Sequence, residues 1–236
     1  MAIVSDEQVI KVLQQYNTWW RTPSAIKEES KPQKRLAYYE ALKTLTHKSI
    51  RRFAVLSGMR RVGKTTILYQ IIEHLIDEGV NPKNILYATF DNPILKLVNV
   101  ENVLSIYESM YPIEGIRYIF FDEVQYTENW ELWMKVSYDS RKDIRLIATG
   151  SASPILEKGS ADSGTGRWSV LKIPTMSFYE YCRLLDLDLP LLPEDLRLSE
   201  LPGYGLAQLG DLMNKFIPLQ NHFNRYLMIG GFPELV

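Results

Sequence analysis

The chain has 236 residues, and its 27 Lys and Arg nearly balance its 28 Asp and Glu. This length allows one large domain and a small appendage, and the near-neutral charge excludes a global field that would attract nucleic acid or an anionic membrane. The only cysteine, Cys182, excludes an intramolecular disulfide and fits a cytoplasmic protein. No run is apolar for long enough to span a bilayer, and the N-terminus lacks the pattern of a signal peptide, so we expect no membrane partner.

The first part of the chain carries two helical patterns. Apolar side chains at helical spacing predict an amphipathic helix over roughly residues 5–20, and a second helix is predicted over about residues 35–45. A polar stretch between them reads as a connector. We expect residues 1–46 to form an N-terminal helical segment that packs on the core.

From Arg52 onward, short apolar strands alternate with turns and amphipathic helices, which is typical of a parallel sheet sandwiched by helices. The predicted strands are FAVLSG (53–58), ILYATF (85–90), RYIFFDE (117–123), IRLIATG (144–150) and SVLKIP (169–174). The predicted helices cover about residues 64–78, 101–110, 130–136, 178–185 and 209–227. We place the core at residues 47–186 and interpret residues 187–236 as a linker and a helical extension.

The segment after the first strand fits the pattern G-x-x-x-x-G-K-[ST] completely, and it lies between an apolar strand and a helix. Glycines let the backbone wrap a phosphate, and the helix N-terminus adds partial positive charge. Lys64 is expected to contact the β and γ phosphates, and the Thr65 hydroxyl to bind Mg²⁺. The predicted nucleotide-binding residues are Gly58, Met59, Arg60, Arg61, Val62, Gly63, Lys64, Thr65 and Thr66.

Two acids, Asp122 and Glu123, end the third predicted strand and resemble a Walker B element. Asp122 would belong to the Mg²⁺ coordination shell, and Glu123 would orient and deprotonate the attacking water. The alternative is a solvated acid pair that caps the next helix.

Further polar residues follow the fourth strand. Thr149 and Ser151 could sense the γ-phosphate, although a plain strand-ending turn also explains them. Arg167 follows a Gly/Ser-rich segment at residues 158–166 and could be an arginine finger, acting in cis or from a neighbouring subunit, or a solvated surface residue. Arg60 and Arg61 could touch phosphate or a partner, or simply form the rim of the loop.

The combination of GMRRVGKTT, YATFDNP, YIFFDEVQ, IATGSAS, GRW, IPTMSFYEY and GGFPE resembles a group of prokaryotic AAA+ family ATPases. The resemblance implies an α/β P-loop NTPase fold, a three-layer sandwich whose parallel sheet has the strand order 5-1-4-3-2. Members often carry a further C-terminal domain of poorly assigned function. Because GGFPE normally leads into that domain, we expect this chain to be truncated before it.

The resemblance also implies ATP and Mg²⁺ as ligands and Mg-dependent ATP hydrolysis, in a switch or motor for an unidentified protein partner or the C-terminal domain. The chain could form a homo-oligomer. Two alternatives remain open: a nucleic-acid-stimulated ATPase of the loader, helicase or transposition type, and a nucleotide-binding module without significant turnover. Tyr38 and Tyr39 could stack on the adenine base, although core packing is an alternative role for at least one of them.

Overall fold

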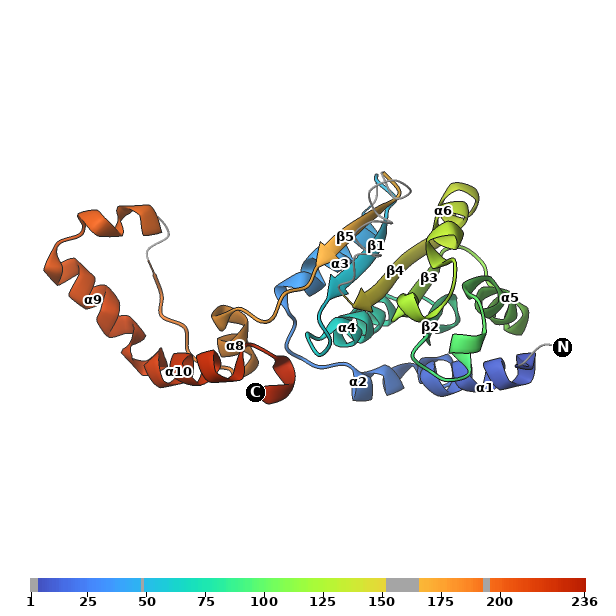
Figure 1. Cartoon of the computed structure of the whole chain (residues 1–236), viewed down its shortest axis with the longest axis horizontal. Coiled ribbons are helices and arrows are strands. Elements are labelled where there is room, and N and C mark those ends of the chain that lie inside the picture. The colour runs from blue at the N-terminus through green and yellow to red at the C-terminus, as the bar shows by residue number, and fades with distance from the viewer. Residues whose placement is uncertain (1–3, 48, 152–165, 193–195) are drawn as a thin grey trace. The chain divides into compact units, whose positions relative to one another are not determined.

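Five parallel strands form the centre of the first part of the chain (Figure 1). Their order across the sheet is β2-β3-β4-β1-β5, which confirms the predicted α/β fold and strand order. The strands are β1 (Phe53–Gly58), β2 (Ile85–Thr89), β3 (Arg117–Asp122), β4 (Ile144–Ser151) and β5 (Trp168–Lys172). This computed structural model describes residues 4–47, 49–151, 166–192 and 196–236.

The chain divides into two compact units, Met1–Pro174 and Thr175–Val236. In the first unit the helices are α1 (Asp6–Tyr16), α2 (Ile26–Glu29), α3 (Leu36–Thr46), α4 (Lys64–Asp77), α5 (Val100–Met110) and α6 (Trp130–Ser140). In the second unit they are α8 (Phe178–Leu184), α9 (Leu206–Phe216) and α10 (Gln220–Ile229). Short 3-10 helices lie at η1 (Thr18–Trp20), η2 (Pro23–Ala25), η3 (Pro82–Asn84), η4 (Leu95–Leu97), η5 (Val124–Tyr126), η6 (Leu198–Gly203), η7 (Ile217–Leu219) and η8 (Pro233–Leu235).

Helices cover both faces of the sheet. Because a crossover between parallel strands is right-handed, the strand order places α4 on one face and both α5 and α6 on the other. Helix α3 contacts α4 and β1 and so lies on the α4 face. The two central strands, β1 and β4, are almost entirely buried between these layers, which explains why their sequences are largely apolar.

The register of the sheet brings the carboxyl ends of four strands to one edge. Gly58 at the end of β1 lies opposite Ser151 at the end of β4. Thr89 at the end of β2 lies opposite Asp122 at the end of β3. Ligands of open parallel sheets bind outside this edge, so the polar residues that follow these strands are the first place to look for a site.

The N-terminal segment covers the outer edge of β2. The Asn17 side chain is buried, donates through Nδ2 to the carbonyl of Tyr87 (2.8 Å) and accepts through Oδ1 from the Tyr87 N–H (2.7 Å). The indole of Trp20 donates to the carbonyl of Ile85 (2.7 Å). The Asn17 side-chain amide thus takes the place of a neighbouring strand. Because Asn17 has to face β2 to make these bonds, α1 ends at Tyr16, although the apolar spacing continues to Trp20. The segment predicted as a connector also contains the short helix α2.

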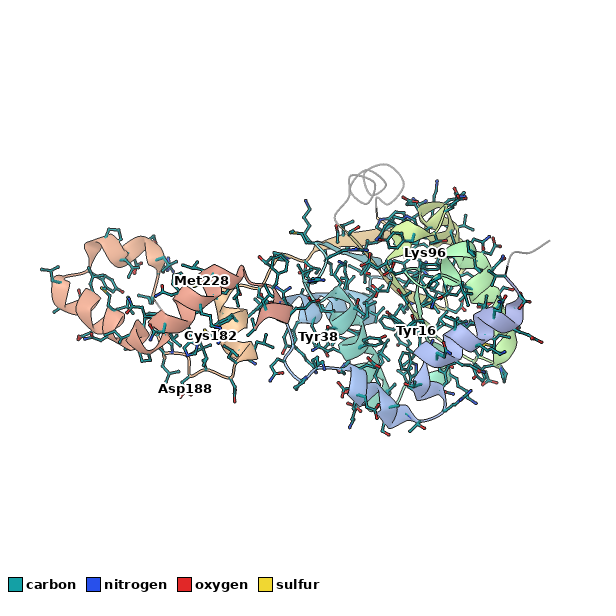
Figure 2. All side chains as sticks on the ribbon, turned by 60° about the horizontal axis from the view of Figure 1, so that its bottom comes forward. Tyr16, Tyr38, Lys96, Cys182, Asp188 and Met228 are labelled. Carbon is teal, nitrogen blue, oxygen red and sulfur yellow. The ribbon has the colours of Figure 1, made fainter. Side chains whose placement is uncertain are left out.

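The second unit has a small core of Tyr181, Cys182 and Leu219. Helix α8 lies within residues 47–186, the predicted core, but it belongs to this unit. The helix predicted over residues 209–227 is two helices, because Pro218 cannot continue α9 and lies in the 3-10 turn η7 that separates α9 from α10. Several apolar side chains of the unit are exposed, among them Met228 of α10 at 87% (Figure 2). Within the described ranges of both units, no helix has the length and apolar character needed to cross a bilayer.

Candidate functional site

The loop between β1 and α4 is a tight turn with positive φ angles close to the helix N-terminus. Gly58 has no room for a side chain, because a Cβ atom would lie 2.4 Å from the carbonyl oxygen of Ile173. Gly63, immediately before α4, has a φ of 89°, and Arg61 has a φ of 67°. Val62 between them is fully buried and anchors the turn. Positive φ angles close to a helix N-terminus turn backbone N–H groups toward one point, as an anion requires.

Lys64 lies inside this loop. Only 4% of its side chain is exposed, and Nζ donates to the carbonyl oxygens of Gly58 and Met59, both at 3.0 Å. The same ammonium lies 3.8 Å from Oε1 of Glu123. Burial lowers the pKa of Lys64, while the carboxylates of Glu123 and Asp122 oppose that shift. The loop therefore encloses a poorly solvated cation.

Asp122 is buried at the end of β3 and accepts three hydroxyl hydrogen bonds. Thr65 Oγ1 and the Tyr87 phenol donate to Oδ2 at 2.8 and 3.0 Å, and Thr149 Oγ1 donates to Oδ1. Burial raises the pKa of Tyr87 well above its usual value, so its phenol remains a donor at neutral pH. The carboxylate is thus tied to α4, β2 and β4 at once.

Glu123 has the left-handed backbone conformation, with φ 53° and ψ 47°. Its N–H donates to Thr149 Oγ1 (3.1 Å), and its Oε2 accepts from the Gln125 side chain. A left-handed residue with a Cβ costs roughly 1–2 kcal/mol, and such strain is concentrated at functional positions. The conformation turns the chain sharply after β3 and directs the Glu123 side chain to Lys64.

The donor set fits a magnesium ion. Thr65 Oγ1 and Asp122 Oδ2 are hard oxygen atoms 2.8 Å apart at the start of α4 and the end of β3. Mg²⁺ is usually held in proteins by one or two such oxygens together with water and phosphate oxygens. Among the described residues, no group of three or more His, Cys, Asp or Glu side chains could hold a metal ion.

The remaining loop residues form its rim. Met59, Arg60 and Arg61 are exposed, and Thr66 is half-buried in the first turn of α4. Arg60 donates to the hydroxyl of Tyr126 on η5 (2.7 Å). One rim arginine is therefore linked to the segment that directly follows Glu123.

The predicted residues on β4 and the one just before β5 lie at opposite ends of the sheet. Ser151 is at the loop edge, opposite Gly58, and Thr149 is fully buried between the two acids. Arg167 accepts through its backbone carbonyl from the N–H of Phe53 (3.0 Å) at the start of β1, and its Nε donates to Asp139 (3.0 Å). The six residues of β1 separate it from the loop by about 15–20 Å. Within one chain, the structure does not bring Arg167 to the site. A role of Arg167 toward a neighbouring subunit stays a prediction. Most of the Gly/Ser-rich segment before it, residues 158–165, lies outside the described residues.

Three contributors to the site were not predicted from the sequence. Tyr87 binds Asp122, Gln125 binds Glu123, and Tyr126 binds Arg60. Gln125 and Tyr126 directly follow the acid pair in the chain. The signal for Tyr87 is weaker, because it depends on β2 lying beside β3.

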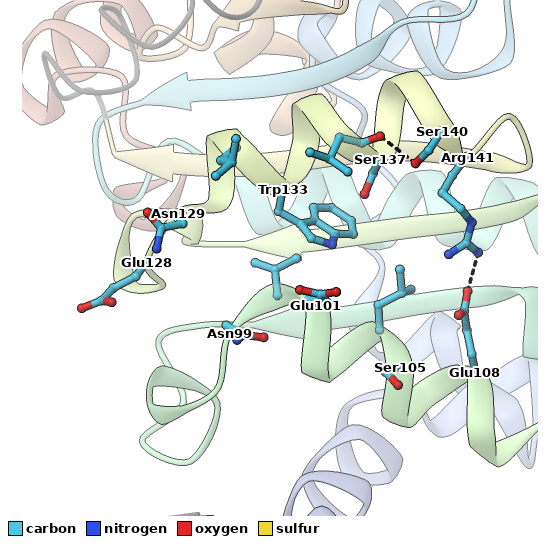
Figure 3. Close-up of a pocket in the computed structure, with 14 residues that line it drawn as sticks. Asn99, Glu101, Ser105, Glu108, Glu128, Asn129, Trp133, Ser137, Ser140 and Arg141 are labelled. Atoms are coloured by element: carbon cyan, nitrogen blue, oxygen red, sulfur yellow. Dashed lines mark hydrogen bonds and ion pairs between the residues drawn. The ribbon is translucent and has the colours of Figure 1, made fainter.

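A hollow of about 570 Å³ lies elsewhere, between α5 and α6 (Figure 3). Val100, Leu104, Leu132 and Trp133 give it an apolar wall, and Arg141 bonds Glu108 at one end (2.6 Å). None of the residues predicted to bind nucleotide or metal lines this hollow.

The fold and the site define a class of protein. A model of the AAA domain family matches residues 50–182, which is more than half of the chain. This chain therefore belongs to that family of AAA+ P-loop ATPases.

Known proteins share parts of the sequence and the fold. An uncharacterised protein of Methanocaldococcus jannaschii, MJ1544, is 26% identical over 185 residues, which cover 78% of this chain and 36% of the relative. An uncharacterised Haemophilus influenzae protein is 30% identical over 156 residues, covering 64% of this chain and 38% of its own. The chain thus spans little more than a third of the length of these relatives. Among solved structures, the S. cerevisiae Hsp104:casein complex in an extended conformation has a TM-score of 0.51 at 14% identity, covering 70% of this chain and 31% of that chain, and this likeness concerns the fold alone.

Proposed function

We propose that this chain binds ATP with Mg²⁺ and hydrolyses it, acting as an AAA+ switch or motor for a partner that is not yet identified. One observation carries the proposal: a buried ammonium, a hydroxyl, two acids and a second hydroxyl meet at the carboxyl edge of β1, β3 and β4. These groups belong to Lys64, Thr65, Asp122, Glu123 and Thr149. Phosphoryl transfer depends on such positioning and charge neutralisation.

In this proposal the loop holds the triphosphate. Lys64 is already desolvated, so its charge acts on phosphate oxygens with little screening by water. Gly63 and the first turn of α4 would present N–H groups to the β-phosphate. Thr65 and Asp122 would hold Mg²⁺, which when bound neutralises charge on the phosphate oxygens.

Glu123 is the proposed general base. Its carboxylate would accept the proton of the attacking water, and Lys64 and Gln125 orient it. Thr149 would respond to the γ-phosphate, since its hydroxyl contacts both acids, and Ser151 would act beside it at the end of β4. Arg167 would act only from a neighbouring subunit of a homo-oligomer.

The test is a pair of substitutions with a matched control. Lys64→Ala should abolish Mg·ATP binding in titration calorimetry. Glu123→Gln should keep that binding and reduce turnover at least a hundredfold, because it removes the base and preserves the shape. Glu128→Gln, at an exposed acid on the same segment, should leave both unchanged. Unchanged turnover in Glu123→Gln would remove the proposed base.

The partner is part of the same proposal. Turnover should be measured with and without DNA, RNA and candidate proteins. Stimulation by nucleic acid that falls steeply with salt would favour the nucleic-acid-stimulated alternative. A lack of turnover at high protein concentration, with binding intact, would favour a nucleotide-binding module.

A further inference from the structure

Arg35 connects the loop to the end of the first unit. It precedes α3, and its Nη1 donates to the carbonyl oxygen of Val62 (2.7 Å) and to that of Pro174 (2.9 Å). Val62 belongs to the loop, and Pro174 is the last residue of the first unit, followed directly by Thr175. One nitrogen atom thus joins two segments that are far apart in the sequence.

Residues 173 and 174, here called the exit segment, also contact the start of the loop. The N–H of Ile173 donates to the carbonyl of Ser57 (2.7 Å), and the Ile173 carbonyl lies so close to Gly58 that no Cβ would fit between them. Residues 173 and 174 therefore contact the loop at its start directly and at its end through Arg35. This makes the exit segment part of the wall that shapes the loop.

The bond to Val62 fixes the direction of a backbone N–H. A trans peptide is planar, so the N–H of Gly63 points opposite to the carbonyl of Val62. A loop that turns its N–H groups toward an anion must turn the matching carbonyls outward. The Arg35 guanidinium lies at such an outward carbonyl, where a charged donor makes a stronger hydrogen bond than a neutral one.

We propose that Arg35 is a positioning residue of the phosphate site, which holds the Gly63 N–H toward the nucleotide and couples the shape of the loop to residues 173 and 174. The proposal rests on the proposed function and adds a residue that lies before the segment matched by the AAA domain family, residues 50–182. Arg35 does not touch the reacting atoms. It acts through the Val62 and Pro174 carbonyls.

The test compares three substitutions. Arg35→Met keeps the length of the side chain and removes its donors, and we expect a Kd for Mg·ATP about tenfold higher, with kcat within about threefold. Arg35→Lys should restore affinity to within about threefold, because a single nitrogen makes both bonds and an ammonium has three donors. Arg145→Met is the control: Arg145 is also half-buried and donates to two backbone carbonyls, of Lys142 and Ile144, away from the loop.

Hydrogen exchange of the nucleotide-free protein separates this proposal from the proposed function. Arg35→Met should accelerate exchange of the Ile173 amide at least tenfold, and Arg145→Met should not. If the parent chain binds no Mg·ATP, the proposed function fails, and unchanged exchange at Ile173 overturns the Arg35 proposal separately. Affinity in Arg35→Met equal to that of the parent, or no rescue by Arg35→Lys, also overturns it. Should Arg35→Met fail to fold, Arg35→Leu, which also lacks donors, takes its place under the same criteria.

Discussion

Replacement of Thr149 tests how the two acids are held. The Thr149 side chain is fully buried, and its single hydroxyl donates to Asp122 and accepts from the N–H of Glu123. Thr149→Val keeps the volume and removes the hydroxyl. A buried N–H left without a partner costs about 1–3 kcal/mol, and a hydrogen bond to a charged group contributes about 1.5–3 kcal/mol.

Because one hydroxyl makes both bonds, we expect a combined loss of about 3 kcal/mol in the free energy of unfolding of the first unit. For a unit of this size the loss lowers Tm by about 6–12 °C. Thr149→Ser keeps the hydroxyl and should lose only about 1 kcal/mol, from one buried methyl group. Urea unfolding and thermal scans of both variants measure the difference. A Val variant as stable as the Ser variant would refute the reasoning.

Three further predictions concern the backbone at Glu123, the glycines Gly58 and Gly210, and the outer edge of β2. In urea unfolding, the Glu123→Gly variant should be about 0.5–1 kcal/mol more stable than the Glu123→Ala variant, because the backbone at position 123 is left-handed. Elsewhere in a chain Ala is usually the more stable of the two. An Ala variant more stable than the Gly variant would contradict the inferred backbone strain. Gly58→Ala should destabilise the protein by about 1–3 kcal/mol, because the added Cβ meets the Ile173 carbonyl. Gly210→Ala, in open space within α9, should instead stabilise it by about 0.5–1 kcal/mol. Equal effects of the two substitutions on Tm would contradict both estimates. Asn17→Ala should cost about 2–4 kcal/mol and accelerate hydrogen exchange of the Tyr87 amide, and retained protection there would contradict the edge contact.

Local pattern was enough to predict the strands. β1 was predicted at residues 53–58 and has those bounds, because a short apolar run followed by Ser57 and Gly58 has few other interpretations in an α/β chain. The nearness of Lys64, Asp122 and Glu123 also followed from the motifs, since parallel strands end at one edge. Their roles in catalysis stay predictions.

Contacts between distant segments could not be predicted in this way. Asn17 and Tyr87 are 70 residues apart, and Arg35 and Pro174 are 139 residues apart. No periodicity in the sequence links such pairs, and each depends on where whole elements pack. Arg167 shows the same limit, because the register of β5 against β1, with Trp168 opposite Phe53, carries it away from the loop.

The sequence also left open which of Tyr38 and Tyr39 packs in the core, because that depends on how α3 packs against the sheet. Tyr38 is 2% exposed and lies on the buried face of α3, whereas Tyr39, the next residue of the same helix, is 54% exposed. Adjacent aromatic residues on a helix look alike in sequence, and only the direction of the helix face separates them. Stacking of Tyr39 on a base stays a prediction.

The cover that Asn17 and Trp20 place on β2 has a practical consequence for protein production. A fragment restricted to residues 50–182, the segment matched by the family, would keep all five strands but expose the free backbone groups of Ile85 and Tyr87. An unprotected apolar edge invites pairing with the same edge of another molecule. Such a fragment should form insoluble or fibrillar material, so a workable expression boundary lies before the first helix.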